Sequence, residues 1–278
     1  MNKANRYSPR LFGLEILGIV IAIIFAMPFY FVFVNSVKSI REILSNAGSL
    51  PTKLELMNYV KSWGIMRFPL MFTNSLFITV ISIAGLIIIS SMAAYRMVRR
   101  PHKLNKFLFV LFVSAMVIPF QAIMIPLVQV AQMFGLMDSR IGLIICYFGF
   151  GVSLSMFLYH GFIKSIPKEI EESAVVDGCS PYGVFWRIVF PLLKPMTVTI
   201  MLLNSLWIWN DFLLPLLVLH QPGIRTIPLA IYSFFGEYTK QWDMALAGLV
   251  MGLVPIVVFF LAMQKSIIEG ITAGAVKG

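Results

Sequence analysis

Six long apolar stretches dominate this sequence and limit it to folds that cross a lipid bilayer. Each stretch can span a hydrocarbon layer of about 30 Å as a helix of about 20 residues. All but the fifth lack Asp, Glu, Lys and Arg, and the fifth is interrupted only by Asp211. The predicted spans are Ile16–Val34, Leu76–Tyr95, Leu108–Val130, Ile141–Gly161, Met196–Leu219 and Met244–Gln264.

The overall composition supports the same class of protein. With 59% hydrophobic and 12% charged residues, and a mean hydropathy of +0.88, the chain has too little polar surface for a soluble globular fold. The apolar stretches are continuous, whereas a membrane barrel needs strands of about ten residues in which apolar and polar positions alternate. Helices satisfy their backbone hydrogen bonds internally in lipid. We therefore predict an all-α polytopic membrane protein with six transmembrane helices.

The basic residues between the spans predict the orientation. Cytoplasmic connections carry an excess of Lys and Arg, so the side with 14 of the 22 basic residues is predicted to be cytoplasmic and to hold both termini. The net charge of +10 is then a topology signal. No basic cluster is interleaved with aromatic residues, so we expect contact with membrane lipid and none with nucleic acid. The first stretch is too long for a signal-peptide core and is expected to remain as a span.

The polar segment 162–195, between the fourth and fifth spans, is predicted to form two short helices set at an angle. Gly178 can adopt the left-handed conformation that ends a helix. Ser180 is a good N-cap and Pro181 suits the first helical position, so the second helix is predicted to run to about Phe190 and to stop before Pro191.

In the first of these short helices, Ile170 and Ala174 are predicted to share a face, with Glu171 and Glu172 beside it. Helix chemistry alone leaves open an amphipathic connector that lies on the lipid headgroups.

The spacing of Glu172, Ala174, Gly178, Ile188 and Pro191 resembles the cytoplasmic loop through which permease subunits of binding-protein-dependent ATP-driven importers touch their ATPase. The family usually has alanine at the position of Ser173. Asp177 before the glycine is typical of the carbohydrate-uptake branch, and the chain resembles the smaller maltose-system permease of that branch. The resemblance implies that the interface with the ATPase contains Glu172, Ser173, Ala174, Asp177, Gly178, Ile188 and Pro191.

The resemblance extends over nearly the whole chain. It includes Asn58-Tyr59, Thr73-Asn74-Ser75 and Trp209-Asn210-Asp211-Phe212, and it implies one permease domain over residues 1–278. The Gly- and Ala-rich end would otherwise be interpreted as disordered. Similar tails insert between two ATPase subunits, which implies a cytoplasmic tail over residues 265–278. Its expected interface residues are Gly270, Thr272, Gly274 and Lys277.

The fifth span is the best candidate for lining a solute path. Asn204, Trp207 and Asp211 fall on one helical face, and Asn210 lies beside them. Charged residues within spans usually face the bundle interior or water, but a structural or gating role for Asp211 stays open. An interfacial anchor role for Trp207 also stays open. Gln121 in the third span is a lesser candidate for the path, between two prolines that are expected to kink the helix. The resemblance implies that the two permeases of a pair can contribute unequally to the substrate site.

The chain lacks a phosphate-binding GxxxxGK[ST] loop, an HExxH motif and a convincing catalytic triad. We therefore expect a transport subunit that is no enzyme, has no metal site and binds no cofactor, with ATP and Mg in a partner ATPase. The resemblance implies two ATPase subunits, a second homologous permease and an extracytoplasmic solute-binding protein. It also implies that segments 37–70 and 220–243 form part of the surface that contacts the solute-binding protein. An oligosaccharide or related sugar is the expected cargo. One alternative is an ion-coupled secondary carrier that uses Asp211. A remoter one is an intramembrane enzyme.

Overall fold

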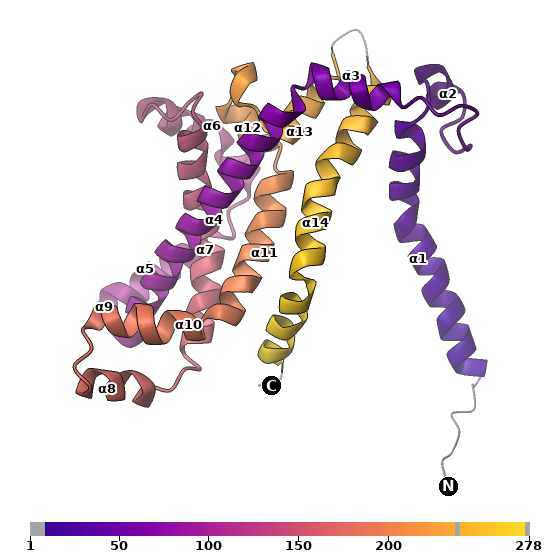
Figure 1. Cartoon of the computed structure of the whole chain (residues 1–278). Helices are drawn as coiled ribbons and strands as arrows, with labels where there is room; N and C mark the ends of the chain where they lie inside the picture. The colour runs from indigo at the N-terminus through magenta and orange to yellow at the C-terminus, as the bar shows by residue number, and fades with distance from the viewer. Residues whose placement is uncertain (1–8, 237–239, 276–278) are drawn as a thin grey trace. The chain divides into compact units, whose positions relative to one another are not determined.

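The computed structural model describes residues 9–236 and 240–275 as helices joined by short connections (Figure 1). The predicted all-α class is confirmed, since the only strand-like pairing among these residues is an isolated bridge between Phe235 and Lys240. A π-helical segment η1 (Val184–Val189) joins α9 to α10, and a 3-10 turn η2 (Pro222–Ile224) precedes α13. The α-helices are α1 (Pro9–Ser36), α2 (Ile40–Ser45), α3 (Met57–Ile65), α4 (Phe68–Arg99), α5 (Lys103–Ala115), α6 (Phe120–Met133), α7 (Arg140–Ile163), α8 (Glu169–Val176), α9 (Pro181–Gly183), α10 (Phe190–Leu192), α11 (Lys194–Asn210), α12 (Leu213–Val218), α13 (Ile227–Tyr232) and α14 (Trp242–Ala275).

Four of the predicted spans are single helices. The first, second, fourth and sixth correspond to α1, α4, α7 and α14, each of which is long and apolar enough to cross a membrane. The number of spans rises to six when α5 with α6, and α9–α10 with α11, are each counted as one bent crossing. The described residues therefore contain four to six membrane spans.

The predicted third span, Leu108–Val130, consists of two helices, because α5 and α6 meet at an angle of 110°. The break lies before Pro119, which is extended, with φ −67° and ψ 136°. Proline has no backbone donor and disfavours helical geometry in the residue before it. The predicted kink at Pro119 is thus a complete break, whereas Pro126 lies inside α6 without ending it.

The predicted fifth span is interrupted at the carboxylate that marks it in the sequence. α11 ends at Asn210, Asp211 is extended with ψ 130°, and α12 begins at Leu213. The continuous helix predicted over Met196–Leu219 is therefore divided in two.

The chain divides into two compact units. One contains residues 1–68 and 231–252, and the other contains residues 69–230 and 253–278. Helix α14 contributes residues to both units.

In the first unit, the connection after α1 is organised around a fully buried lysine. Lys38 Nζ donates to the carbonyl of Asn46 (3.1 Å), and Asn58 Nδ2 donates to the carbonyl of Lys38 (2.8 Å). Ser62 Oγ on α3 donates to the carbonyl of Met244 on α14 (2.6 Å). This connection is therefore an ordered structure, because buried polar groups of this kind are stable only when they are hydrogen-bonded.

In the second unit, α4 and α7 approach closely through two glycines. A Cβ atom on Gly85 would overlap the ring of Phe148, and a Cβ atom on Gly151 would lie 2.6 Å from Leu86 Cδ1. Each helix thus has a glycine where the other inserts a large side chain, an arrangement that permits close packing of membrane helices. α7 also packs against α5 and α11, so it lies at the centre of this unit.

At the end of the second unit remote from α8, Asn74 and Ser75 hold the connection between α12 and α13. Asn74 Nδ2 donates to the carbonyl of Gly223 (3.0 Å), and its Oδ1 accepts from Arg140 Nη1 (3.1 Å). Ser75 Oγ accepts from the amide of Ile227 (2.9 Å). Two residues of the Thr73-Asn74-Ser75 segment therefore fix a connection about 150 residues away in sequence.

Candidate functional site

Residues 162–195 connect α7 to α11 and are called the coupling loop after the role that the resemblance implies for them. Their first helix ends at the glycine predicted to end it. Gly178 has a φ of +84°, in the left-handed region that favours glycine. Its amide donates to the carbonyl of Val175 (3.0 Å), and the amide of Cys179 donates to the carbonyl of Ala174 (2.9 Å). These two bonds form a Schellman motif, which satisfies carbonyls left open at a helix end. The prediction that Gly178 ends the first helix is confirmed.

The second helix of the coupling loop begins as predicted. Ser180 is the N-cap, since its Oγ accepts from the amide of Gly183 (3.2 Å), and Pro181 lies in the first turn. The predicted pair of short helices (Figure 1) is therefore present.

The predicted end of this second helix before Pro191 is wrong, because helical structure continues to Leu192. The segment before Pro191 is π-helical, with the Phe190 amide donating to the carbonyl of Phe185. An α-helix would direct the carbonyl of residue 187 at the proline ring, and the wider π turn removes this conflict. The chain then bends by 72° into α11.

A buried ion pair fastens the coupling loop to the end of α4. Glu171 Oε1 accepts from Arg99 Nη2 (2.6 Å) and from Arg99 Nε (2.7 Å), and the two side chains are only 11% and 12% exposed. Tyr95 donates to the other carboxylate oxygen (2.9 Å), and Arg99 Nη2 also donates to the carbonyl of Ile166 (2.9 Å). We refer to Glu171, Arg99 and Tyr95 as the loop anchor. It joins α8 to a span that is 72 residues away in sequence.

Aromatic packing reinforces the loop anchor. The ring of Phe185, which is buried, lies 5.2 Å from the ring of Tyr95 and 4.9 Å from that of Trp186. Val189 and Leu193 are fully buried in the same core cluster. The coupling loop is therefore part of the packed core of its unit.

The predicted interface residues divide between the two faces of the coupling loop. Ala174 is 7% exposed and Ile188 is half-buried, so both pack toward the core. On the same short helix Ile170 is exposed. Ile170 and Ala174 lie on one face of α8, as predicted, but only its Ala174 end is buried. The exposed positions are Glu172, Ser173, Asp177, Gly178 and Pro191.

The exposed side of α8 combines acidic and apolar groups. Val176 is 87% exposed between Glu172 and Asp177, and the Glu172 carboxylate has no hydrogen bond or ion pair within the described part of the chain. A hollow of about 630 Å³ is lined by the turn that follows α8 and by the second helix of the loop, with Asp177, Trp186 and Arg187 among its lining residues. This surface can offer one unpaired carboxylate and an apolar contact to a partner.

Two of the predicted path residues meet in one cavity. A space of about 470 Å³ is lined by Asn204 and Trp207 of α11, by Phe150 of α7 and by Met116 and Ile118 at the break between α5 and α6. Asn204 Nδ2 donates to Ser155 Oγ (3.2 Å). Irregular backbone at membrane depth is tolerated where it lines such a cavity.

Asp211 lies at the break between α11 and α12, where it receives hydrogen bonds. Its Oδ1 accepts from the amide of Leu213 (3.0 Å), and its Oδ2 accepts from the hydroxyl of Tyr147 (2.9 Å). The ring of Tyr147 also lies edge-on to that of Trp207, with centroids 5.5 Å apart. These hydrogen bonds hold the Asp211 carboxylate at the helix break.

The remaining predicted residues lie elsewhere. Asn210 is exposed and donates to the carbonyl of Leu206 (2.8 Å), and Gln121 is exposed at the start of α6, outside the lining of the Asn204 cavity. The backbone of α14 includes Gly270, Thr272 and Gly274, whereas Lys277 lies outside the described residues.

The loop anchor is the feature of this site that sequence reasoning missed. The sequence predicts Glu171 beside the face that contains Ala174, and it indicates for Arg99 only a contribution to the charge bias that predicts topology. No local pattern links the two, because their contact depends on how α4 and α8 pack. One indication was available in the sequence. The acidic pair Glu171-Glu172 and the basic run at the end of the second predicted span are predicted to lie on the same side of the membrane.

The chain matches the family of binding-protein-dependent transport system inner membrane components over residues 85–268. It is 44% identical over 95% of its length to a probable starch degradation products transport system permease protein of Thermoanaerobacterium thermosulfurigenes, covering 96% of that protein. It is 36% identical to the melibiose/raffinose/stachyose import permease protein of Bacillus subtilis (strain 168), over 100% of both chains.

A third relative is the multiple sugar-binding transport system permease protein of Streptococcus mutans serotype c (strain ATCC 700610 / UA159), at 34% identity over 92% of this chain and 93% of that protein. Among solved structures, a bacterial ABC transporter involved in the import of the acidic polysaccharide alginate has a chain of the same fold, with a TM-score of 0.78. That likeness covers 95% of this chain and 99% of the other at 23% identity.

Proposed function

The chain belongs to the family of binding-protein-dependent transport system inner membrane components, and we propose that it forms half of the path for an oligosaccharide or related sugar in an ATP-driven importer. The observation that carries this proposal is similarity over more than nine-tenths of the chain to three permeases named for sugar or starch-product transport. These relatives do not support the alternative of an ion-coupled carrier.

Reconstituted uptake tests the proposal. The complete importer in proteoliposomes should accumulate labelled oligosaccharide only when ATP and the solute-binding protein are both supplied. Collapsing the proton and sodium gradients should leave the initial rate unchanged. Uptake that continues without ATP but stops with an ion gradient would contradict the proposal.

Membership of this family implies a partner permease, an ATPase and a binding protein in general, and we propose their number and arrangement. One second homologous permease would enclose the path with this chain, and two ATPase subunits would bind ATP and Mg. An extracytoplasmic solute-binding protein would deliver the sugar. The chain would lie as a multi-pass subunit in a prokaryotic cytoplasmic membrane with both termini in the cytoplasm, supported by the 14 basic residues on that side.

The coupling loop is the proposed contact with the ATPase. Its exposed face presents Glu172, Val176 and Asp177, while its inner face is held by the loop anchor. A force applied to the exposed face would reach α7 and α11 through the chain itself. It would also reach α4 through Glu171 and Arg99, so three helices would move together.

Replacing Glu172 tests this contact. Loss of one member of a desolvated charge pair costs about 2–5 kcal/mol, so Glu172→Ala should abolish ATP-dependent uptake while the protein still inserts into the membrane. Glu169→Ala is the matched control, because Glu169 is an exposed acidic residue of the same helix. Wild-type uptake by Glu172→Ala with normal ATPase association would remove the loop from the coupling role.

The tail after residue 264 is proposed to insert between the two ATPase subunits, with Gly270, Thr272, Gly274 and Lys277 at the interface. Small residues permit close backbone approach. Deletion of Gly270–Gly278 should lower ATPase association in detergent or uncouple hydrolysis from uptake. If neither quantity changes, the tail has no part in coupling.

The cavity lined by Asn204 and Trp207 is proposed as the part of the solute path in this subunit. An indole face stacks on sugar C–H groups, and an amide bonds hydroxyl groups. Trp207→Ala should reduce sugar uptake while the stimulation of ATP hydrolysis by the solute-binding protein persists. Trp209→Phe is the control, since Trp209 is buried and its ring packs edge-on against Phe72. Equal uptake by wild type and Trp207→Ala would exclude Trp207 from the path.

A further inference from the structure

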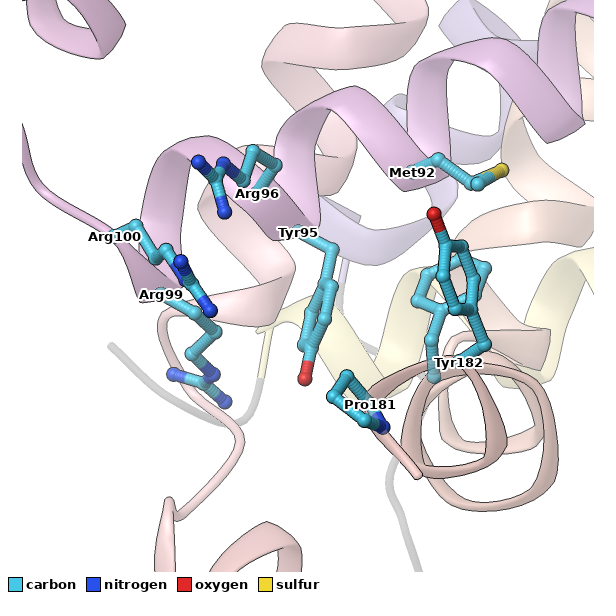
Figure 2. A pocket seen from close by; sticks show the side chains of 8 residues that line it. Met92, Tyr95, Arg96, Arg99, Arg100, Pro181 and Tyr182 are labelled. Carbon is cyan, nitrogen blue, oxygen red and sulfur yellow. The ribbon is translucent and has the colours of Figure 1, made fainter. Parts of the chain in front are cut away.

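A pocket of about 440 Å³ lies between the end of α4 and the second helix of the coupling loop. Figure 2 shows Arg96, Arg99 and Arg100 on one side of it and Tyr182 on the other. No carboxylate is among its lining residues, which are Met92, Tyr95, Arg96, Arg99, Arg100, Pro181, Tyr182 and Phe185.

The positive charge of this pocket is only partly balanced within the described chain. Arg99 is paired with Glu171, whereas the guanidinium groups of Arg96 and Arg100 have no hydrogen bond or ion pair among the described residues. Both are exposed and stand four positions apart on α4. Like charges at this spacing repel one another, so an anion between them would relieve the repulsion.

The rest of the pocket is apolar. Met92, Phe185 and the ring of Tyr182 line the pocket together with the arginines, and Tyr182 is 72% exposed despite its size. The volume lies within the range of about 300–1,000 Å³ typical of small-molecule sites. A ligand that matches this lining has an anionic group joined to an apolar portion.

The position along α4 favours a lipid as the source of that ligand. Arg96 and Arg100 stand at the end of a membrane span, on the side of the coupling loop. The proposed function makes this the cytoplasmic side, and the inference rests on it in this respect. Anionic lipids of the cytoplasmic leaflet are attracted to basic residues next to spans, and basic pockets between helices bind their headgroups.

We propose that this pocket binds an anionic phospholipid of the inner leaflet, with its phosphate between Arg96 and Arg100 and its glycerol and first acyl carbons against Met92, Tyr182 and Phe185. A lipid bound there touches both α4 and the coupling loop. It therefore bridges the same two elements that the loop anchor joins.

Native mass spectrometry of the full-length chain in detergent tests the site with phosphatidylglycerol and phosphatidylcholine as probes. Wild type should bind phosphatidylglycerol preferentially. Each basic residue contributes about 1 kcal/mol to the attraction of an anionic lipid. The variant Arg96→Gln/Arg100→Gln lacks two of them, so it should bind phosphatidylglycerol about 30-fold more weakly than wild type. Lys103→Gln/Lys106→Gln is the matched control, because it removes two exposed charges of the neighbouring α5 that do not line the pocket. It should retain most of the binding.

A second variant separates a built pocket from general attraction to surface charge. Tyr182→Ala removes an apolar wall without changing the charge and should also weaken phosphatidylglycerol binding. Unchanged binding by either pocket variant, or an equal loss in the lysine control, would overturn the proposal.

Two further results would assign the pocket elsewhere. Inorganic phosphate that binds as well as the lipid, with no preference for phosphatidylglycerol, would make the site one for soluble phosphate. Loss of ATPase association by Arg96→Gln/Arg100→Gln with unchanged lipid binding would assign the arginines to a protein interface. Lipid binding is measured without sugar or ATP. A negative lipid result would therefore not contradict the proposed transport function, and a negative transport result would not change the interpretation of lipid binding.

Discussion

In the second unit, Glu171 in the coupling loop and Asp211 at the break in the fifth predicted span are both inward-facing carboxylates, and they are stabilised differently. Glu171 is paired with the guanidinium of Arg99, whereas Asp211 accepts hydrogen bonds from the neutral Tyr147 hydroxyl and the Leu213 amide. Removing Glu171 would leave a buried cation without its partner. Removing Asp211 would leave only neutral donors. Loss of its carboxylate should therefore destabilise the loop anchor more than the helix break.

The largest effect is expected from breaking the loop anchor. Glu171→Leu should lower the free energy of unfolding by about 3–5 kcal/mol, because Arg99 then becomes an uncompensated buried charge. The measurement is thermal or denaturant unfolding of the purified chain in detergent. Glu169→Leu, at an exposed position of the same helix, is the control and should change stability little.

Restoring electrical balance sharpens the same test. Glu171→Leu/Arg99→Leu removes both charges, and apolar replacements of a buried pair are often neutral or stabilising. The double variant should therefore be more stable than Glu171→Leu alone. If the two are equally destabilised, the ion pair is not the source of the sensitivity.

A smaller loss is expected at the break in the fifth predicted span. Asp211→Ala leaves the Tyr147 hydroxyl and the Leu213 amide without their acceptor, at about 1–3 kcal/mol for a buried donor left unsatisfied. Asp211→Asn keeps an acceptor oxygen and should retain most of the stability and ATP-driven uptake. If Asp211→Asn loses uptake while its free energy of unfolding is unchanged, transport requires the negative charge of Asp211, and a purely structural role for this residue is wrong.

The turn between the short helices should contribute less again. Gly178→Ala places a Cβ atom in open space, so the only expected penalty is the left-handed backbone, at about 1–2 kcal/mol. Gly161→Ala is the control, since that Cβ atom also meets open space and α7 is helical there. Equal unfolding free energies for the two variants would show that the turn relaxes without strain.

The smallest effect is expected from Asp138, a partly exposed carboxylate in the connection before α7. Backbone amides of His220 and Gln221 donate to Asp138 and, with His220 as a nearby charge, lower the pKa of its carboxyl group. A lowered folded pKa stabilises the folded state above the unfolded pKa of about 3.9. This contribution is lost as the pH falls through the folded pKa. Unfolding midpoints measured through this range should fall more for wild type than for Asp138→Asn, and parallel curves would contradict the assignment.

The coupling loop illustrates how far local sequence chemistry reaches. Gly178, Ser180 and Pro181 act within a few residues of their own positions, so the helix end and the next helix start could be predicted. The end at Pro191 could not, because the π turn before it depends on how Phe185 and Val189 pack in the core. Likewise Pro119 predicted a kink, but nothing local predicted an angle of 110°.

In the candidate solute path, too, some features could be predicted from local sequence and others depend on packing between helices. The polar face of α11 could be predicted from helical periodicity, and it brings Asn204 and Trp207 into one cavity. The role of Asp211 could not be decided, because its acceptor sites are filled partly by Tyr147 of another helix. Gln121 fits the chemistry of a path residue but lies outside this cavity, since the break turns α6 away from the direction of α5.

Hydrophobic length and helix capping depend on neighbours along the chain, so the membrane class, the positions of the apolar segments and the caps of the coupling loop could be predicted without coordinates. Tertiary packing was needed to show that Glu171 faces inward to Arg99 while Glu172 faces outward, and that two arginines at the end of α4 stand beside an apolar pocket. These outcomes depend on contacts between residues about 70 or more positions apart. A carboxylate on a short helix has the same local chemistry on either face, and packing selects the partner that it meets.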